Sequence, residues 1–271
     1  MALSVNTNPG ADLGIQQLNK TKRDLLKTGN RITTGLKVNG PKDDAAIFAI
    51  AQALRGQVAG ATAVKGALSA GESTVATALA AGQTVSDLLI EMKAKIVQGN
   101  QSGMDASSRN ALNNDLAALS ENLSTIVSTA EFNGTNLIDS GASDLFVLSA
   151  EDGSTITVSA QDLSAGGLGV DTLSLLTEAD AEAALAAIDA ALNSATSGLA
   201  DLGSSAQRLE DQNDFTSQIN DSLSQGIGNL VDADLGEEAA NLALNQVKEQ
   251  LGMRTLAIAN AGPRSILSLF P

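Results

Sequence analysis

The long stretch without proline between Pro41 and Pro263 constrains this chain more than any other feature. Proline stands at only four positions, 9, 41, 263 and 271, so the backbone between 41 and 263 lacks its strongest helix breaker. Apolar residues recur there at steps of three and four, the spacing of helices that pack side by side as coiled coils. The stripes run through Val58, Ala61, Leu68, Val75, Leu79, Leu89 and Ile96, then Leu112, Leu116, Leu119, Leu123 and Ile126, and then Leu185, Ile188, Leu192, Leu199, Leu202, Leu209, Leu223, Ile227 and Leu230. We therefore predict helices over about 42–98, 105–130 and 177–230, the last roughly 80 Å long.

The segment between the second and third of these helices has a different pattern. Residues 144–150 and 154–160 are short runs rich in β-branched, hydroxyl and large apolar residues, and Glu151-Asp152-Gly153 lies between them. Asp-Gly is a strong turn signal, so we predict a β-hairpin over about 144–160. Asp105, and Thr177 with Asp180 three residues later, are predicted helix caps. The expected fold is mainly α, a long antiparallel coiled-coil hairpin or bundle that carries a small β-hairpin.

The two ends of the chain form matching arms, residues 1–40 and 232–271. Each arm alone would be marginal in water, since its apolar stripe has nothing to bury against. We expect the arms to fold back on each other and to require partners, with 41–231 as a second, rod-like domain. For the stripes within 54–230, packing inside one molecule is the favoured interpretation, and for the arms contact between molecules is favoured. The arm residues expected at subunit interfaces are Ile15, Leu18, Leu25, Ile32, Leu36, Leu244, Val247, Leu251 and Ile258.

Asp43 and Asp44 are the pair that could indicate catalysis or metal binding. Pro41 suits a first helical position, and carboxylates in a first turn are stabilised by the helix dipole. Adjacent helical residues also point about 100° apart, so the pair cannot converge on one atom unaided. We interpret Pro41, Asp43 and Asp44 as the start of a helix. The chain has no His and no Cys, which excludes imidazole bases, thiol nucleophiles and zinc sites, and we expect neither an enzyme nor a cofactor.

Charge and hydropathy narrow the partners further. The formal net charge is −15, and the 16 Lys and Arg do not form the basic face that nucleic-acid binding requires. No stretch approaches the roughly 18 apolar residues of a membrane span, and the first thirty residues contain no apolar segment of signal-peptide length. We expect no nucleic acid, no membrane span, and either a cytoplasmic location or export without such a signal.

Paired motifs at the two ends resemble bacterial flagellin. At the amino-terminal end they are Asn6-Thr7-Asn8, Leu18-Asn19-Lys20, the run from Asn30 to Val38, Lys42-Asp43-Asp44-Ala45-Ala46 and Ala49-Ile50-Ala51. At the carboxy-terminal end they are Asp232 to Leu235, Gln246-Val247, Gln250-Leu251-Gly252, Ala257 to Asn260, Pro263 and Ser265 to Leu269. The resemblance covers nearly the whole chain, which has the length of the short members without large outer domains.

The resemblance implies a structural subunit of the flagellar filament, with both arms in the inner layer of the filament and 41–231 in the second layer. It implies a helical, head-to-tail homopolymer outside the cell, exported by the flagellar type III apparatus without a cleaved signal peptide. Other flagellins, the filament cap, hook-junction proteins and an export chaperone are the implied partners, and outward Ser and Thr are candidates for glycosylation. Two alternatives stay open from the sequence: a hook–filament junction protein with similar arms, and a soluble coiled-coil signalling protein.

Overall fold

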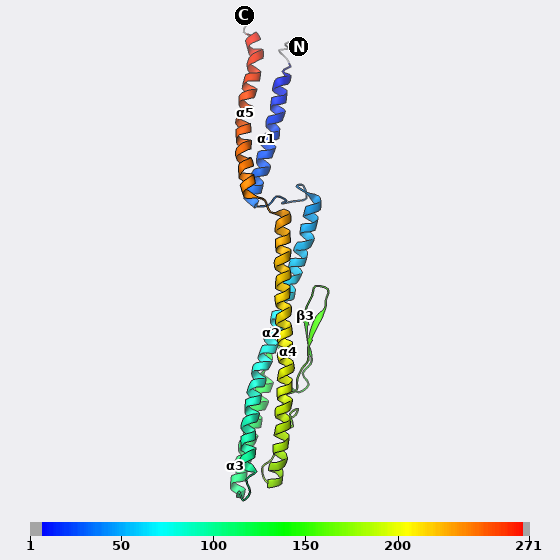
Figure 1. Cartoon of the computed structure of the whole chain (residues 1–271), viewed down its shortest axis with the longest axis vertical. Coiled ribbons are helices and arrows are strands. Elements are labelled where there is room, and N and C mark those ends of the chain that lie inside the picture. The colour runs from blue at the N-terminus through cyan, green and yellow to red at the C-terminus, as the bar shows by residue number, and fades with distance from the viewer. Residues whose placement is uncertain (1–6, 268–271) are drawn as a thin grey trace. The chain divides into compact units, whose positions relative to one another are not determined.

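The computed structural model describes residues 7–267, and residues 1–6 and 268–271, with the parts of the arm motifs that fall there, lie outside it. Five helices account for most of the described residues (Figure 1): α1 (Pro9–Thr34), α2 (Ala45–Gly99), α3 (Ala106–Thr129), α4 (Glu178–Val231) and α5 (Leu235–Leu267). Four short strands, β1 (Glu131–Phe132), β2 (Thr135–Asn136), β3 (Leu145–Leu148) and β4 (Thr155–Val158), lie between α3 and α4 in sequence. The mainly helical fold with a small β-hairpin that the sequence predicts is confirmed. Helix α2 begins at Ala45, three residues after the start expected at about residue 42.

The described chain forms two compact units whose boundaries lie inside helices. One consists of residues 1–56 and 222–271, and is called the arm unit here; the other, 57–221, is the bundle unit. These boundaries differ from the expected ones at 40/41 and 231/232, where the helices break. The reason is a small core in which Val38 packs with Ile47, Phe48 and Val231. Because of that core, the ends of α2 and α4 near the breaks belong with the arms.

Helices α2, α3 and α4 supply the core of the bundle unit. Leu68, Leu89, Leu116, Ile188 and Leu202 are fully buried in one continuous apolar cluster, on the stripes that the sequence shows. Burial of a side chain of this size stabilises the fold by about 1.5–3 kcal/mol. This is the intramolecular packing predicted for the middle of the chain.

Polar contacts along the edges of the helical packing fix the register of the bundle unit. Lys93 of α2 forms an ion pair of 2.6 Å with Asp189 of α4, and Asn213 Nδ2 donates to Glu72 Oε1 at 2.9 Å. On the other side of α2, Lys95 pairs with Asp115 of α3 at 2.7 Å. The side chains of the two ion pairs are 30–54% exposed, so each ion pair adds little energy and mainly selects one register, and the bond between Asn213 and Glu72 is half-buried.

The β-hairpin follows the predicted turn and has one buried face. Strands β3 and β4 are antiparallel, and Gly153 between them has φ of 90°. Val147 and Val158 are buried, whereas Phe146 is 66% exposed on the opposite face. A Cβ at Gly71 of α2 would lie 2.6 Å from Val147 Cγ2, so only glycine lets the hairpin approach the helix this closely.

Helix starts follow the predicted caps closely. Asp105 Oδ1 accepts from the backbone N–H of Ser108 at 3.2 Å. Thr177 and Asp180 form the reciprocal pair of a capping box, each backbone N–H donating to the other side chain at 3.1 Å. Both of these short motifs are therefore local caps.

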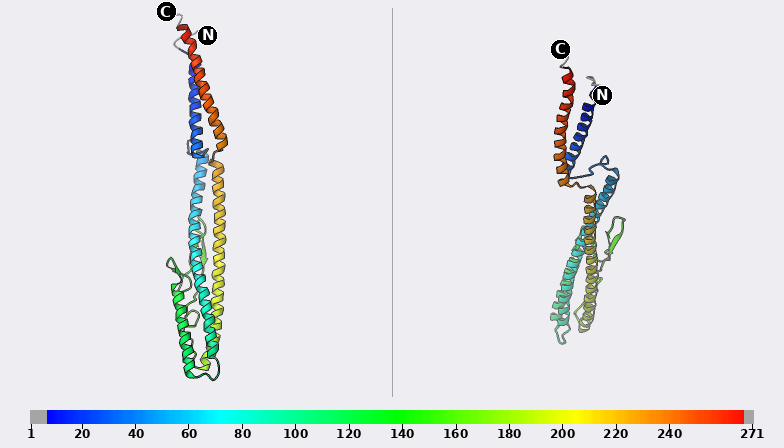
Figure 2. Two further views of the ribbon diagram at one scale, coloured as in Figure 1. Left: turned by 90° about the vertical axis from the view of Figure 1, so that its left-hand side faces the viewer. Right: turned by 45° about the horizontal axis from the view of Figure 1, so that its top comes forward.

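The arm unit contains α1 and α5, which lie side by side in every view (Figure 2). Asn8 is the N-cap of α1, and its side chain also donates to the carbonyl of Ala259 in α5 at 2.9 Å. By length and composition, one helix among the described residues, α2, could cross a membrane. Alanine gives that helix much of its apolar character, 17% of its most apolar stretch is buried, and its large side chains Leu68, Leu89 and Met92 are buried in the bundle unit.

Candidate functional site

The fully buried positions of the contact between α1 and α5 are small or polar residues, and the larger apolar residues along it are only half-buried. Thr21, Thr28 and Asn245 are buried there, and Leu18 Cδ1 lies against Gly252. Gly14 lies in the same way against Leu256. Glycine and threonine let two backbones approach closely, but they bury little apolar area. The arms are therefore held together by weak apolar burial.

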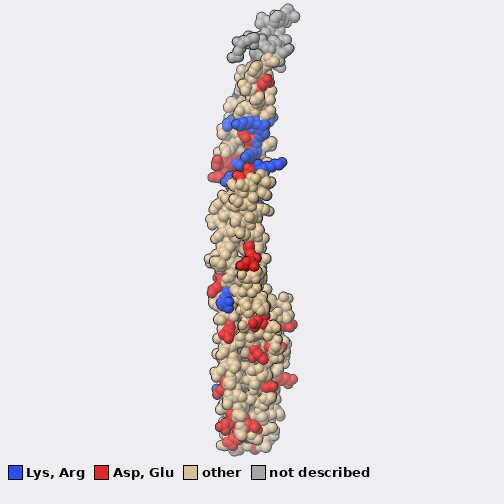
Figure 3. Space-filling model, turned by 90° about the vertical axis from the view of Figure 1, so that its right-hand side faces the viewer, with Lys and Arg blue, Asp and Glu red and all other residues tan. Residues whose placement is uncertain are grey.

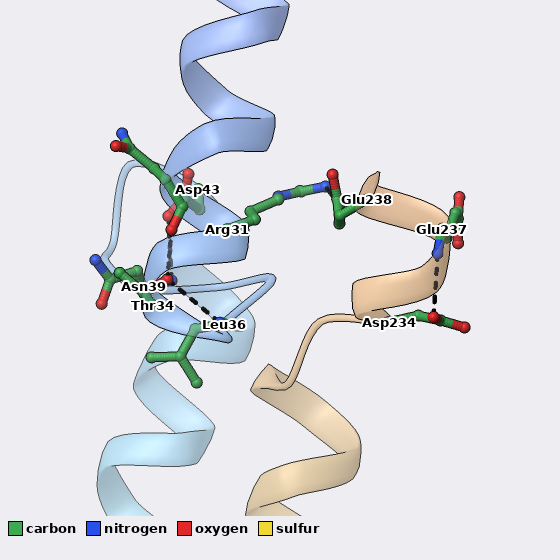
Figure 4. Close-up of polar contacts among 9 residues, drawn as sticks. Arg31, Thr34, Leu36, Asn39, Asp43, Asp234, Glu237 and Glu238 are labelled. Carbon is green, nitrogen blue, oxygen red and sulfur yellow. Dashed lines mark hydrogen bonds and ion pairs between the residues drawn. The ribbon is translucent and has the colours of Figure 1, made fainter. Parts of the chain in front are cut away.

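An ion pair joins the arms at the end near the helix breaks. Arg31 Nη1 of α1 donates to Glu238 Oε1 of α5 at 2.6 Å, and only 9% of the Glu238 side chain is exposed (Figure 4). The Arg31 Nε is buried without a hydrogen-bond partner in the described part of the chain. Removing one partner from a buried pair of this kind leaves the other charge uncompensated. This pair cannot be recognised in the sequence, because Glu238 follows Glu237 in the first turn of α5, a position where the helix dipole already accounts for an acidic residue.

The chain crosses between helices twice at this end, and the two crossings hydrogen-bond to each other. Lys37 N donates to the carbonyl of Val231 at 2.6 Å, and Ala233 N donates to that of Gly35 at 2.9 Å. Gly35 ends α1 in the left-handed conformation, with φ of 72°. The residues around Gly35, within the motif from Asn30 to Val38, thus form a corner in which backbone hydrogen bonds hold the two connections in register.

Asp43 and Asp44 have separate local roles at the start of α2. Asp44 Oδ1 accepts from the backbone N–H groups of Ala46 and Ile47, both at 3.0 Å, and so caps the helix. Asp43 Oδ2 accepts from Asn39 N at 3.1 Å and closes the preceding loop (Figure 4). The expectation that Pro41 is the first helical residue is wrong, because residues 41–43 form a turn and α2 begins at Ala45. The turn forms because Asp43 N donates to the carbonyl of Gly40 at 3.1 Å.

The other end of this corner begins α5. Asp234 Oδ1 accepts from Gly236 N at 2.8 Å and from Glu237 N at 3.1 Å, so Asp234 is the cap. The backbone of Asp232 pairs with that of Leu36 in an isolated antiparallel bridge. Among residues 7–267, no group of three or more His, Cys, Asp or Glu is placed to hold a metal ion.

The predicted arm residues separate into two groups. Leu18, Leu25 and Ile32 are half-buried along the contact between α1 and α5, and Leu36 packs in the small core beside Val38. Ile15 is 44% exposed.

The predicted residues of α5 do not line the arm contact. Leu244, Val247, Leu251 and Ile258 are 49%, 54%, 55% and 74% exposed. At about 100° per residue they lie within about 60° of one another around α5. These four residues are called the α5 stripe below. The face of α5 toward α1 is occupied instead by Glu238, Asn245 and Gly252, so the contact between molecules expected for the α5 stripe stays a prediction.

A groove lies where the α5 stripe meets the edge of the arm contact. Its volume is about 290 Å³, and it is lined by Gly14, Thr21, Leu251, Gly252 and Thr255, among others. Most of its lining is apolar. The groove and the stripe together form an apolar surface that the arm unit itself leaves uncovered.

The comparisons with known proteins agree with this arrangement. Residues 5–142 match the family model of the bacterial flagellin N-terminal helical region, and residues 185–270 match that of the bacterial flagellin C-terminal helical region. The chain is 43% identical to the flagellin FljM of Caulobacter vibrioides over the full length of both proteins, and 32% identical to a flagellin of Brucella melitensis, covering 98% of this chain and 99% of that protein.

Two solved structures share the fold. The crystal structure of Bacillus cereus flagellin is 25% identical, with a TM-score of 0.50 over 54% of this chain and 86% of that one. A protein described as hook-associated from Vibrio parahaemolyticus has a TM-score of 0.59 at 15% identity, over 70% of this chain and 100% of that one. At 15% identity the second likeness shows the fold alone.

Proposed function

The chain belongs to the bacterial flagellin family and is a structural subunit of the extracellular flagellar filament, and we propose that it enters the filament by burying its α5 stripe against neighbouring copies. The observation that carries this proposal is the exposure of Leu244, Val247, Leu251 and Ile258 on one face of α5. The arm contact uses a different face and cannot cover them. Large apolar side chains that gather on one exposed face of a helix mark a contact surface.

The energy available from the α5 stripe is sufficient to matter for assembly. Full burial of one such side chain contributes about 2 kcal/mol, so burying the exposed fractions of all four contributes about 4–5 kcal/mol per subunit. Assembly brings together chains of net charge −15, whose repulsion this burial must offset. Exposed residues on the bundle unit, among them Ile90, Phe146 and Phe215, offer further apolar contacts.

The contact is heterologous in this proposal, because the stripe of one copy meets a different surface on the next. Such contacts generate an open helical fibre instead of a closed ring. The groove beside Leu251, of about 290 Å³, is the proposed acceptor for an apolar side chain of a neighbour. The half-buried positions Leu18, Leu25, Ile32 and Leu36 hold the arms and the corner together, and Ile15 adds to the outward surface.

Membership of the family supports further proposals about how the subunit is exported and which proteins it meets in the flagellum. The chain would leave the cell through the flagellar type III export apparatus without a cleaved signal peptide, accompanied by an export chaperone. It would join other flagellins between the hook-junction proteins and the filament cap. Nothing favours the junction or signalling alternatives, and a structural role gives no reason to expect enzymatic activity.

Seeded polymerisation tests the proposal directly. Purified full-length chain is mixed with short filament fragments, and elongation is followed by light scattering and electron microscopy. We expect long fibres above a critical concentration, with Leu251 and Ile258 protected from solvent in the fibre and accessible in the monomer by hydroxyl-radical footprinting. Fibres in which these positions stay as accessible as in the monomer would refute the α5 stripe as the contact.

A further inference from the structure

Positive and negative charge are separated between the two units of this chain. The bundle unit holds five Lys and Arg against 22 Asp and Glu, a formal charge of −17, whereas the arm unit holds 11 against nine, a formal +2. Seven of the 16 basic residues lie between Lys20 and Lys42, where Asp24 is the only acid. Figure 3 shows Lys and Arg gathered over the arm helices and mainly Asp and Glu over the bundle unit.

Three of these cations form a stripe on α1 that faces away from α5. Lys20, Arg23 and Lys27 lie within about 60° of one another around the helix at about 100° per residue. All three are exposed, and among the described residues none forms an ion pair or a side-chain hydrogen bond. Thr21 and Thr28, buried against α5, lie on the other side of α1. Lys20, Arg23 and Lys27 are called the basic stripe below.

The basic stripe opens into a groove at the corner of the arm unit. Arg23, Lys27 and Lys42 line this groove, whose volume is about 430 Å³, together with Asn30 and Asn39. Asp43 is the only acid in its lining, and Asp43 already accepts a hydrogen bond from Asn39 N. The basic stripe and Lys42 therefore carry more positive charge than Asp24 and Asp43, the acids beside them, can neutralise.

We propose that the basic stripe docks on the acidic bundle unit of a second copy of this chain, an inference that rests on the proposed assembly into a filament. The partner follows from charge complementarity. The bundle unit of each copy has a formal charge of −17. Within the described residues, the basic stripe is the cluster of unpaired positive charge that such a surface could contact. A phosphate backbone fits less well, since a chain of net charge −15 repels it.

This pairing gives the charges of the chain an orienting role in assembly. Bundle units repel one another, so copies that meet through their bundle units alone are disfavoured. Contact between the basic stripe of one copy and the bundle unit of the next relieves that repulsion and is directional, because the two surfaces differ. Charge complementarity of this kind acts mainly on encounter rate and register, and apolar burial on the α5 stripe supplies the remaining energy.

A charge-matched pair of variants tests the inference in the full-length chain. The triple variant K20Q/R23Q/K27Q removes the basic stripe, and the control K22Q/K65Q/R208Q removes two exposed lysines and one exposed arginine elsewhere, so both reach a net charge of −18. At 0.1 M salt we expect the critical concentration of the stripe variant to exceed that of the control about tenfold, the effect of a few exposed ion pairs. At 1 M salt the two should converge, because the screening length falls from about 10 Å to about 3 Å.

Zero-length carbodiimide crosslinking of wild-type fibres identifies the other side of the contact. Fibres grown from a mixture of isotopically light and heavy chains distinguish links between copies from links within one. We expect Lys20 and Lys27 to be linked to Asp or Glu of residues 57–221 in another copy. Links to acids of the arm unit alone would overturn the proposal, as would equal critical concentrations for the two variants at 0.1 M salt.

Two further results separate this inference from its premise. If wild-type chain forms no fibres under any seeded condition, the proposed assembly itself fails. A second result would instead identify the basic stripe as a lipid contact. In that case both variants form fibres equally well, and the wild-type chain binds vesicles of phosphatidylglycerol whereas the stripe variant does not. The proposed docking on a second copy is then wrong.

Discussion

A single charge placed on the α5 stripe should prevent assembly without unfolding the monomer. Leu251 is 55% exposed, so burying this exposed part of its side chain between copies contributes about 1 kcal/mol. Replacing it with Asp loses that contribution and also places an unpaired carboxylate in a dry contact, which costs several kcal/mol more. A total of about 4 kcal/mol corresponds to a critical concentration roughly 10³-fold higher.

The assay compares Leu251→Asp with Leu251→Ala and with Met253→Asp. Met253 is 51% exposed, close to Leu251 in exposure, but lies roughly 160° away around α5. Sedimentation after seeding gives the critical concentration of each variant, and circular dichroism gives the thermal transition of each monomer. We expect about a fivefold increase for Leu251→Ala, no measurable fibre for Leu251→Asp, and a critical concentration within about tenfold of wild type for Met253→Asp.

Two outcomes would contradict the reasoning. The α5 stripe is not the contact if Leu251→Asp assembles within tenfold of wild type, or if Met253→Asp blocks assembly as completely. A large shift in the monomer transition of Leu251→Asp would mean that the residue stabilises the folded monomer, contrary to its exposure.

Three further predictions concern the monomer. Glu238→Gln should leave Arg31 without its charged partner and weaken the arm contact by about 1–3 kcal/mol, seen as faster hydrogen exchange along α1, whereas Glu237→Gln should have little effect; equal exchange in the two variants would deny the ion pair this role. Gly71→Leu should displace the β3–β4 hairpin through its clash with Val147 and lower the thermal midpoint, while Gly66→Ala, with no atom within 4 Å of the added Cβ, should raise it slightly; an unchanged midpoint for Gly71→Leu would show that the hairpin does not need this close approach. The hydrogen bonds from Ser108, side chain first and then backbone, lower the pKa of Asp105 from its ordinary value of 3.8. Its contribution to the start of α3 is therefore present above pH 3.8 and is lost as the pH falls through the lowered pKa, which carboxyl NMR titration measures; a titration at the ordinary value would contradict the cap.

Local features of the fold could be predicted from short motifs because the interactions that fix them are short-range. The capping box at Thr177 and Asp180 and the turn at Gly153 involve residues within a few positions of each other, so the sequence itself contains the whole interaction. Pro41 shows the limit even at this scale. Its ring suits a helix start, but the hydrogen bond from Asp43 N to Gly40 closes a turn first, and Asp44 then becomes the cap.

The heptad spacing by itself determined that this chain makes long helices with apolar stripes, since a period near 3.5 residues is a property of one helix. The tertiary structure decided which stripe meets which neighbour. Gly14 and Gly252 allow α1 and α5 to approach through a small, polar face, and the pair Arg31–Glu238 fixes that face, so the larger apolar residues of α5 point outward. A periodic pattern cannot encode this choice, because the energy of a stripe depends on what covers it and the same leucines fit a partner arm or a second molecule equally well.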